Sequence, residues 1–305
     1  MTTIAPTRQA RLSIRAREAI YGYLFIAPAV LGFILWIAGP MIFSAWVSLT
    51  QWDMLSPPKI VGLQNYRQML EDGLFWQSLK VTMYFTVVSV PLFQALAFAV
   101  ALLMNVKVRG ITVFRTIYYL PSIVPVVASS MLWAWIFNSD FGLLNSLLQA
   151  VGLPKVLWLQ DPTWAMPALI VMSLWGIGGT MLIYLAGLQG VPAQLYEAAE
   201  IDGAGKWQQF LHVTVPMMSP VIFFNLVLGL IGALQTFTQG YIITNGGPGN
   251  STLFYVLYLY RQAFTYFNMG YASAMAWVLF VIILALTLLV FRYVGRMVYY
   301  EDESR

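Results

Sequence analysis

The feature that most constrains this chain is a set of long apolar runs without any charged residue. A helix needs about 20 apolar residues to cross about 30 Å of hydrocarbon. Six runs reach that length, the fifth being cut from a longer stretch by a turn cluster at residues 245–250: residues 19–52, 81–106, 116–139, 164–188, 218–244 and 271–291. The sequence therefore predicts an all-α integral membrane protein, folded as a bundle of six transmembrane helices.

The composition supports the same class and excludes several functions. Hydrophobic residues make up 60% of the chain and charged residues only 9%, whereas soluble domains carry about 25% charged residues. Cys is absent and His212 is the only His, so we expect no disulfide, no thiol chemistry and no metal site. A dispersed net charge of +4 predicts no nucleic-acid partner.

The distribution of Lys and Arg predicts which side of the membrane each loop occupies. Eleven of the 16 basic residues lie in the N-terminal tail, the loops after the second and fourth runs, and the C-terminal tail. Because cytoplasmic loops are enriched in Lys and Arg, we expect both termini in the cytoplasm. Residues 1–20 would form a cytoplasmic tail, either as a short helix on the inner leaflet or as a solvated segment. Residues 21–294 would form the membrane domain and residues 295–305 a second cytoplasmic tail.

The loop over residues 190–217 carries the most informative pattern. Pro192 is placed to begin a helix, Glu197 and Glu200 would lie in its first turns, and Gly203 and Gly205 can end it. A second helix would run from residue 206 towards residue 216. On composition alone, such a helix–turn–helix could be an ordinary connection between two membrane helices.

The spacing within this loop resembles a known motif. Glu197-Ala198-Ala199 is followed after three residues by Gly203, and after nine more by Val213 and then Val215-Pro216. This pattern resembles the EAA loop of binding-protein-dependent importer permeases of the ATP-binding-cassette (ABC) class. Stretches similar to the carbohydrate-uptake, maltose-type branch of these permeases lie at residues 23–28, 61–66, 118–121, 185–188, 244–248 and 270–274. The chain differs from the maltose-type subunit with eight spans, because it has six and lacks a large outer domain.

The resemblance implies an assembly in the bacterial plasma (inner) membrane. It implies a second permease subunit as heterodimer partner, two ATPase subunits that hold ATP and Mg²⁺, and a solute-binding lipoprotein. This chain would contact lipid and sugar, bind no cofactor and act as a transport subunit without enzymatic activity. The residues implied to couple it to the ATPase, with Glu197 paired to a basic residue there and Gly203 at the bend, are Glu197, Ala198, Ala199, Asp202, Gly203, Ala204, Gly205 and Pro216. Glu197 could instead be a simple helix charge.

Uncharged polar residues within the spans indicate where a solute could pass. Gln235 and Gln239 are four apart, so both would face one side of a helix, and the resemblance places Trp175 and Gly176 beside sugar contacts. The candidate pathway residues are Gln235, Gln239, Thr236, Thr238, Trp175, Gly176, Trp133 and Asn138. Polar and small residues also hold membrane helices together, which is the alternative role for each of them.

Three functions remain to be compared. The resemblance favours a sugar permease, with a permease for glycerol 3-phosphate or a related polyol or phosphodiester as an alternative. No charged residue lies in the central part of a predicted span, whereas proton- or ion-coupled carriers normally need one, and no internal repeat of the kind found in such carriers is visible. A membrane enzyme would need an acid, a His or a Cys within a span, and none is present there.

Overall fold

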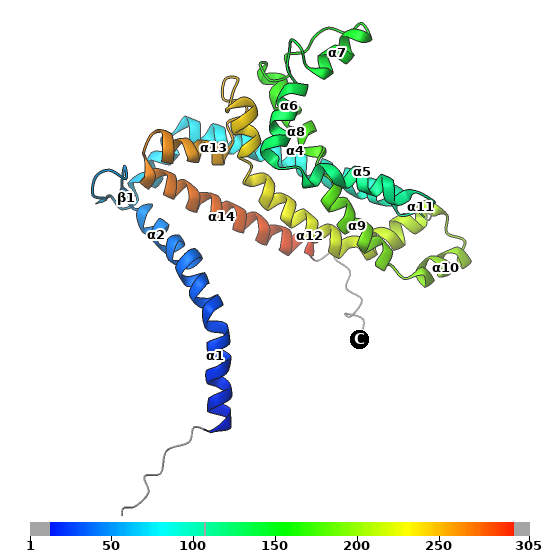
Figure 1. Ribbon diagram of the computed structural model, residues 1–305, viewed down its shortest axis with the longest axis horizontal. Helices are drawn as coiled ribbons and strands as arrows, with labels where there is room; N and C mark the ends of the chain where they lie inside the picture. The colour runs from blue at the N-terminus through cyan, green and yellow to red at the C-terminus, as the bar shows by residue number, and fades with distance from the viewer. Residues whose placement is uncertain (1–12, 107, 296–305) are drawn as a thin grey trace, which may run out of the picture.

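The computed structural model describes residues 13–106 and 108–295, and most of them are helical (Figure 1). Segments labelled η are π-helical, with five residues each. The helical elements are α1 (Ile14–Phe33), η1 (Ile34–Ala38), α2 (Gly39–Val47), α3 (Gln64–Glu71), α4 (Gly73–Met104), α5 (Ile111–Ile123), α6 (Val126–Ile136), α7 (Leu143–Ala150), α8 (Pro162–Leu174), α9 (Gly178–Gly190), α10 (Ala193–Ile201), α11 (Lys206–Gln209), η2 (Phe210–Thr214), α12 (Val215–Leu234), η3 (Gly240–Thr244), α13 (Tyr255–Tyr260), η4 (Arg261–Thr265) and α14 (Met269–Tyr293). Two short strands, β1 (Thr50–Gln51) and β2 (Lys59–Ile60), form an antiparallel pair.

The membrane crossings agree in number with the sequence prediction. Within the described residues, four helices are long and apolar enough to cross a membrane alone: Arg17–Val47, Gly73–Met104, Lys206–Leu234 and Met269–Tyr293. Two more crossings are bent pairs, α5 with α6 and α8 with α9, and counting each pair as one span gives six. The all-α membrane class is therefore confirmed, while the cytoplasmic position of the termini stays a prediction.

Several predicted boundaries were wrong. The third crossing is two helices, because α5 and α6 meet at 98° where Val124 is extended before Pro125; a residue before proline disfavours the helical region. The second crossing begins at Gly73 rather than at residue 81. The fifth begins at Lys206 and ends at Leu234, ten residues before the predicted end at residue 244.

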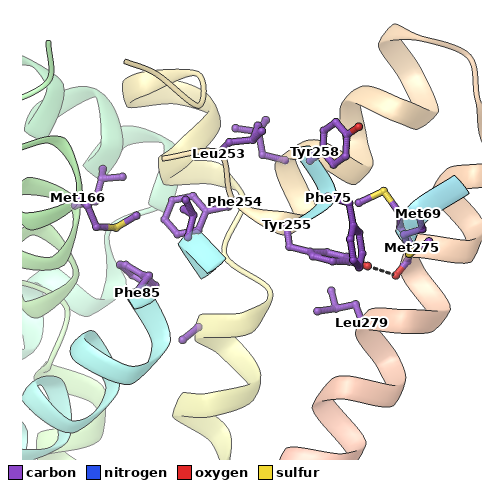
Figure 2. Close-up of a cluster of buried hydrophobic side chains, with 14 of the residues drawn as sticks. Met69, Phe75, Phe85, Met166, Leu253, Phe254, Tyr255, Tyr258, Met275 and Leu279 are labelled. Atoms are coloured by element: carbon purple, nitrogen blue, oxygen red, sulfur yellow. Dashed lines mark hydrogen bonds between the residues drawn. The ribbon is translucent and has the colours of Figure 1, made fainter. Parts of the chain in front are cut away.

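Helix α4 lies at the centre of the bundle and packs against α8, α9, α12 and α13. One buried cluster joins α4 to α13 and α14, where the rings of Phe75 and Tyr255 meet edge to face at 5.7 Å. Tyr255 Oη donates to Met275 O at 2.9 Å across this cluster (Figure 2). A second cluster joins α4 to α9 and α12, and fully buried Ala97 and Ala101 let the helices approach closely there.

The first crossing stands apart from the other helices. No residue in its most apolar 18-residue window is buried, and α1 diverges from the bundle in Figure 1. Its later part, α2, returns to α14, where Trp277 Nε1 donates to Ser44 Oγ at 3.1 Å. Residues 1–12 and 296–305, predicted to belong to the two tails, lie outside the described residues. Because α1 begins at Ile14, the remainder of the tail predicted over residues 1–20 is already helical.

A half-buried carboxylate joins three helices at the end of the bundle near β1. Asp72 caps α4 by accepting a hydrogen bond from Leu74 N at 2.8 Å, and its Oδ2 accepts from the hydroxyls of Tyr258 (2.5 Å) and Tyr271 (2.6 Å). Burial raises the pKa of Asp72, but the two tyrosine hydroxyls and the backbone N–H groups outweigh it, so the pKa lies below its usual value. The ionised carboxylate therefore fixes α13 and α14 against the start of α4.

We expect Asp72→Asn to lower the free energy of unfolding at neutral pH by roughly 1–3 kcal/mol, because two tyrosine hydroxyls lose a charged hydrogen-bond acceptor. Because the folded-state pKa is lowered, the stability from the carboxylate is present above about pH 3.9 and is lost as the pH falls through the folded value. Thermal unfolding of the purified protein in detergent, followed from neutral to acidic pH, measures both effects.

Asp161 offers a matched control, since it caps α8 through Thr163 N and no tyrosine hydroxyl donates to it in the described part of the chain. Asn caps a helix about as well as Asp, so Asp161→Asn should change little. Equal effects of the two substitutions would show that the tyrosine bonds to Asp72 contribute nothing.

Candidate functional site

The α10–α11 segment forms a helical elbow whose first arm ends in a defined backbone motif. After α10, Gly203 N donates to Glu200 O at 3.0 Å and Ala204 N donates to Ala199 O at 2.9 Å. This pair of bonds is the Schellman ending, which requires a residue in the left-handed conformation. Gly203 adopts this conformation, with a φ of +80°, so the helix end predicted at this glycine is confirmed.

Side chains close the elbow on itself. Gly205 precedes α11, and its N–H donates to Gln208 Oε1 at 2.8 Å. The buried Gln209 donates to Ala204 O at 3.2 Å, and Tyr196 and Thr214 share a hydrogen bond of 3.0 Å. These bonds link α10, the turn and η2, so the elbow is held as one unit.

Glu197 and Glu200 occupy different environments. Both were predicted in the first turns of the helix, but only Glu197 lies near that end, in the second turn of α10, whereas Glu200 lies in the last. Glu200 lies in the last turn, near the carbonyl end of the helix, where an acid is unfavourable. Lys206 offsets this with an ion pair of 3.0 Å, and its hydrogen bond holds the pKa of Glu200 below the usual value. Glu197 is exposed and pairs with no basic side chain of the described residues.

Residues close to Glu197 in the sequence also face solvent, and two of them are large and apolar. Ala198 and the C-cap residue Asp202 are exposed and Ala199 is half-buried. Ile201 is 87% exposed and Trp207 70% exposed. In the described residues nothing covers this surface, which combines a free carboxylate with apolar contacts.

The second arm of the elbow is continuous with a membrane helix. α11, η2 and α12 form one uninterrupted helix over Lys206–Leu234. Pro216 lies in the first turn of α12, directly after the π-helical segment, whose wider turn accommodates a residue without an N–H to donate. A displacement of the elbow would therefore move α12 as a lever.

The far end of this helix borders a cavity whose largely apolar lining carries several polar groups. α12 ends at Leu234, and residues 235–237 are non-helical before the chain turns helical again. Non-helical backbone at membrane depth is tolerated only where protein covers it or where it lines a cavity. A cavity of about 220 Å³ lies here between α4, α8 and α12 and is lined by Phe85, Ser89, Val90, Phe93, Gln94, Ser173, Gly229, Gly232, Ala233, Thr236 and Gln239.

Two of the predicted pathway residues, Thr236 and Gln239, line this cavity, and their side chains form no hydrogen bond with the described residues. The expectation that Gln235 and Gln239 share one helix face was wrong, because α12 ends between them. Gln235 is exposed at the helix end, and Thr238, half-buried, follows the break. Neither lines the cavity.

The predicted residues of the third and fourth crossings form a separate aromatic group. The rings of Trp133 and Trp175 meet edge to face at 6.1 Å, with Trp175 and Gly176 in the bend between α8 and α9. Trp133 Nε1 is buried and has no hydrogen-bond partner among the described residues. Asn138 instead shapes a turn, since its Oδ1 accepts from Asp140 N and Phe141 N.

The sequence analysis missed two cavity residues on α4, Ser89 and Gln94. Gln94 lies deep in the bundle, where its Nε2 donates to Asn225 O at 2.6 Å and its Oε1 accepts from Tyr184 Oη at 2.8 Å. An amide in the middle of an apolar span was the signal used for the fifth crossing, and applied to residues 81–106 it would have found Gln94.

Comparisons with known proteins agree with this architecture. Residues 75–298 match the model of a family described as binding-protein-dependent transport system inner membrane component. A probable ABC transporter permease of Bacillus subtilis, YesP, is 45% identical over 96% of this chain and 96% of its own length. The trehalose/maltose transport system permease MalF of Thermococcus litoralis is 38% identical over 93% of this chain and 96% of its own length.

Among solved structures, a chain of a bacterial ABC transporter that imports the acidic polysaccharide alginate superposes with a TM-score of 0.80 at 24% identity. The match covers 92% of this chain and 96% of that one. At this identity the likeness shows a shared fold.

We expect Gly203→Ala to loosen the end of α10. A Cβ at this position would meet no atom within 4 Å, so the cost is that of a left-handed backbone alone, roughly 1–2 kcal/mol. Amide hydrogen exchange in the last turn of α10 should accelerate by about 5- to 30-fold. Gly205→Ala is the control, because Gly205 has an ordinary φ of −70°; acceleration of the same size in both variants would refute the role of Gly203.

Proposed function

Because this chain belongs to the binding-protein-dependent transport system inner membrane components, we propose that it is one of two permease subunits of an ATP-driven importer for a neutral sugar. The observation that carries the proposal is the physical continuity between the α10–α11 elbow and the cavity beside Thr236 and Gln239. A single helix, Lys206–Leu234, has the elbow at one end and the cavity at the other.

In the proposed mechanism, the elbow is the part that an ATPase subunit grips. The carboxylate of Glu197 would pair with a basic residue of that partner, whereas the carboxylate of Glu200 already pairs with Lys206. The apolar surface of Ile201 and Trp207 would pack in the same interface. Binding of ATP and Mg²⁺ in two such subunits would draw the elbows together and tilt α12, thereby opening the cavity to alternate sides of the membrane.

The elbow would then lie in the cytoplasm, as the distribution of Lys and Arg predicts, together with both termini. A solute-binding lipoprotein would deliver substrate at the opposite end, near β1 (Figure 1). The second permease is supported by the first crossing, whose apolar helix has no buried residue in its central window and is free to pack on another subunit.

The proposed substrate class follows from the lining of the cavity. Its polar groups are amides and hydroxyls, and no Lys or Arg lines it. Phosphate is normally held by Arg, Lys or clustered backbone N–H groups, so a neutral sugar fits better than the glycerol 3-phosphate alternative. A volume of about 220 Å³ lies below the 300–1,000 Å³ typical of ligand sites, so the second permease would complete the site. The permease MalF of Thermococcus litoralis, whose name assigns it trehalose and maltose, supports the choice of sugar.

We expect Glu197→Ala to abolish most transport in vesicles that contain the complete importer. A charge-assisted contact of about 1.5–3 kcal/mol would be lost, equivalent to a decrease of roughly 10- to 100-fold in coupled transport. ATPase activity stimulated by the sugar-loaded binding protein should fall in parallel, while the subunits still co-purify.

Glu200→Ala is the matched control. The carboxylate of Glu200 already pairs with Lys206 of the same chain, so its removal should affect transport only weakly. The proposed function fails if Glu197→Ala transports at the normal rate, or if the chain moves solute without any ATPase subunit.

We expect Gln239→Leu to impair transport with the complex and its basal ATPase activity intact. Leu keeps a similar volume but removes an amide that has no partner among the described residues and lines the cavity. The Michaelis constant for transport of sugar delivered by the binding protein should rise about 10-fold, which is the effect of losing one hydrogen bond to a neutral ligand. Thr238→Val, outside the lining, is the control, and an equal effect of both would assign them to helix packing.

A further inference from the structure

A second polar cavity lies at the end of the bundle opposite the elbow. It measures about 300 Å³ and is enclosed by the β1–β2 hairpin, α3 and the loop before α14. The lining residues with free polar or aromatic groups are Gln51, Trp52, Asp53, Lys59, Gln64, Gln68 and Phe267. No residue of this cavity belongs to the proposed pathway or to the elbow.

The walls of this cavity are fixed by backbone contacts. Buried Asn65 donates to Ser48 O at 2.8 Å and to Thr50 O at 2.9 Å, which ties α3 to the hairpin. Met269 N donates to Trp52 O at 2.9 Å, and a Cβ on Gly270 would lie 1.8 Å from Thr50 O. The three segments can meet only with glycine at this position, so the cavity is formed before any ligand arrives.

Its polar groups are available to a ligand. Gln64 and Gln68 are one helical turn apart on α3, so their amides lie on the same face. Neither they nor Gln51 and Lys59 form a side-chain hydrogen bond with the described residues. Asp53 Oδ1 accepts from Ser56 N and Ser56 Oγ, both at 2.8 Å, which leaves its Oδ2 free.

An aromatic ring is held at this cavity in an unfavourable backbone conformation. Phe267 has a φ of +57°, a region that bulky residues rarely adopt, and its side chain is 48% exposed. The cost of such a conformation is roughly 1–2 kcal/mol. Hydrophobic burial does not account for an exposed ring at this position, whereas contact with a ligand would.

The chemistry of the lining selects the class of ligand. Asp53 and Lys59 carry opposite charges, so the lining favours neither anions nor cations. Amides both donate and accept hydrogen bonds, as hydroxyl groups require, and the rings of Trp52 and Phe267 offer flat apolar faces to CH groups. The volume of about 300 Å³ corresponds to roughly ten water molecules at about 30 Å³ each, which is room for one sugar ring.

We propose that this cavity is a saccharide site separate from the transport pathway, which binds one ring of a neutral sugar at the end of the bundle opposite the elbow. The choice of sugars as probes rests on the proposed function, but the site itself does not. Bound there, the end of an oligosaccharide would be retained beside the importer outside the translocation path.

The absence of Cys from the chain permits a local reporter. Leu55 is 87% exposed and contributes only its backbone N–H to the loop around Asp53. A Leu55→Cys variant carrying a trifluoromethyl label, in the complete importer in lipid nanodiscs without the binding protein, reports ligand binding at this cavity by fluorine NMR. We expect saturable shifts with maltose, trehalose or lactose, and none from the same label at Phe141→Cys on the distant α6–α7 loop.

Two variants test the assignment, so that the test does not fail if one of them does not fold. Phe267→Gly relieves the left-handed strain and removes the ring, so it should leave thermal stability unchanged or higher while weakening sugar affinity at least fivefold. Gln64→Ala combined with Gln68→Ala should weaken it similarly. Unchanged titrations in both variants, or no shift with any of the three sugars, would overturn the proposal.

Other outcomes separate this site from the proposed function. Gln239→Leu should leave the label titration unchanged, so a defect in transport alone concerns only the pathway. A shift of the label by sugar-free binding protein, with no response to sugar, would make the cavity a protein docking point and would refute the saccharide assignment.

Discussion

The structure depends on a single constraint, namely that hydrocarbon offers no hydrogen bonds to an exposed backbone. Apolar side chains can face lipid at every crossing, but a helix can be interrupted only where protein or a solvated cavity covers the freed peptide groups. The bend between α8 and α9 and the end of α12 at Leu234 satisfy this condition together, because Ser173 and Thr236 from these two interruptions line the same cavity. Placing broken helices beside each other thus produces a polar site inside an apolar bundle.

The same constraint explains the contrast between the two ends of α12. From Lys206 to Leu234 the helix is continuous, so one helix joins the elbow to the cavity. At the elbow, the Schellman ending at Gly203 and the contacts of Gln209 make the connection to α10 equally defined. In the proposed mechanism, a defined connection at the elbow and an interrupted backbone after Leu234 would together turn a displacement of the elbow into a rearrangement at the cavity.

The sequence was sufficient for features that depend on composition along the chain. The crossings, the all-α class and the helix end at Gly203 followed from apolar length and from glycine chemistry. The 98° bend at Val124–Pro125 was not recognised, because apolar composition is the same for one span and for two half-spans. The positions of Gln94 and Ser89 at the cavity depended on tertiary contacts, which hydropathy does not report. The helix start at Pro192 and its end at Gly203 were both predicted, and a nine-residue helix between them already puts Glu200 in the last turn. The pairing of Glu200 with Lys206 likewise distinguished two acids that sequence spacing had treated alike.

In the proposed function, a second subunit would complete the transport pathway, and two features of this chain favour such a partner. Its central cavity of about 220 Å³ is smaller than the sites that enclose most small ligands, and Thr236 and Gln239 face it without partners among the described residues. The first crossing meanwhile exposes its whole apolar window. Lipid can solvate this window, but lipid does not hold α1 at a fixed position relative to the other helices. A single partner bundle could account for both features. By packing against α1 it would fix the first crossing, and by closing the cavity it would cover the polar groups of Thr236 and Gln239.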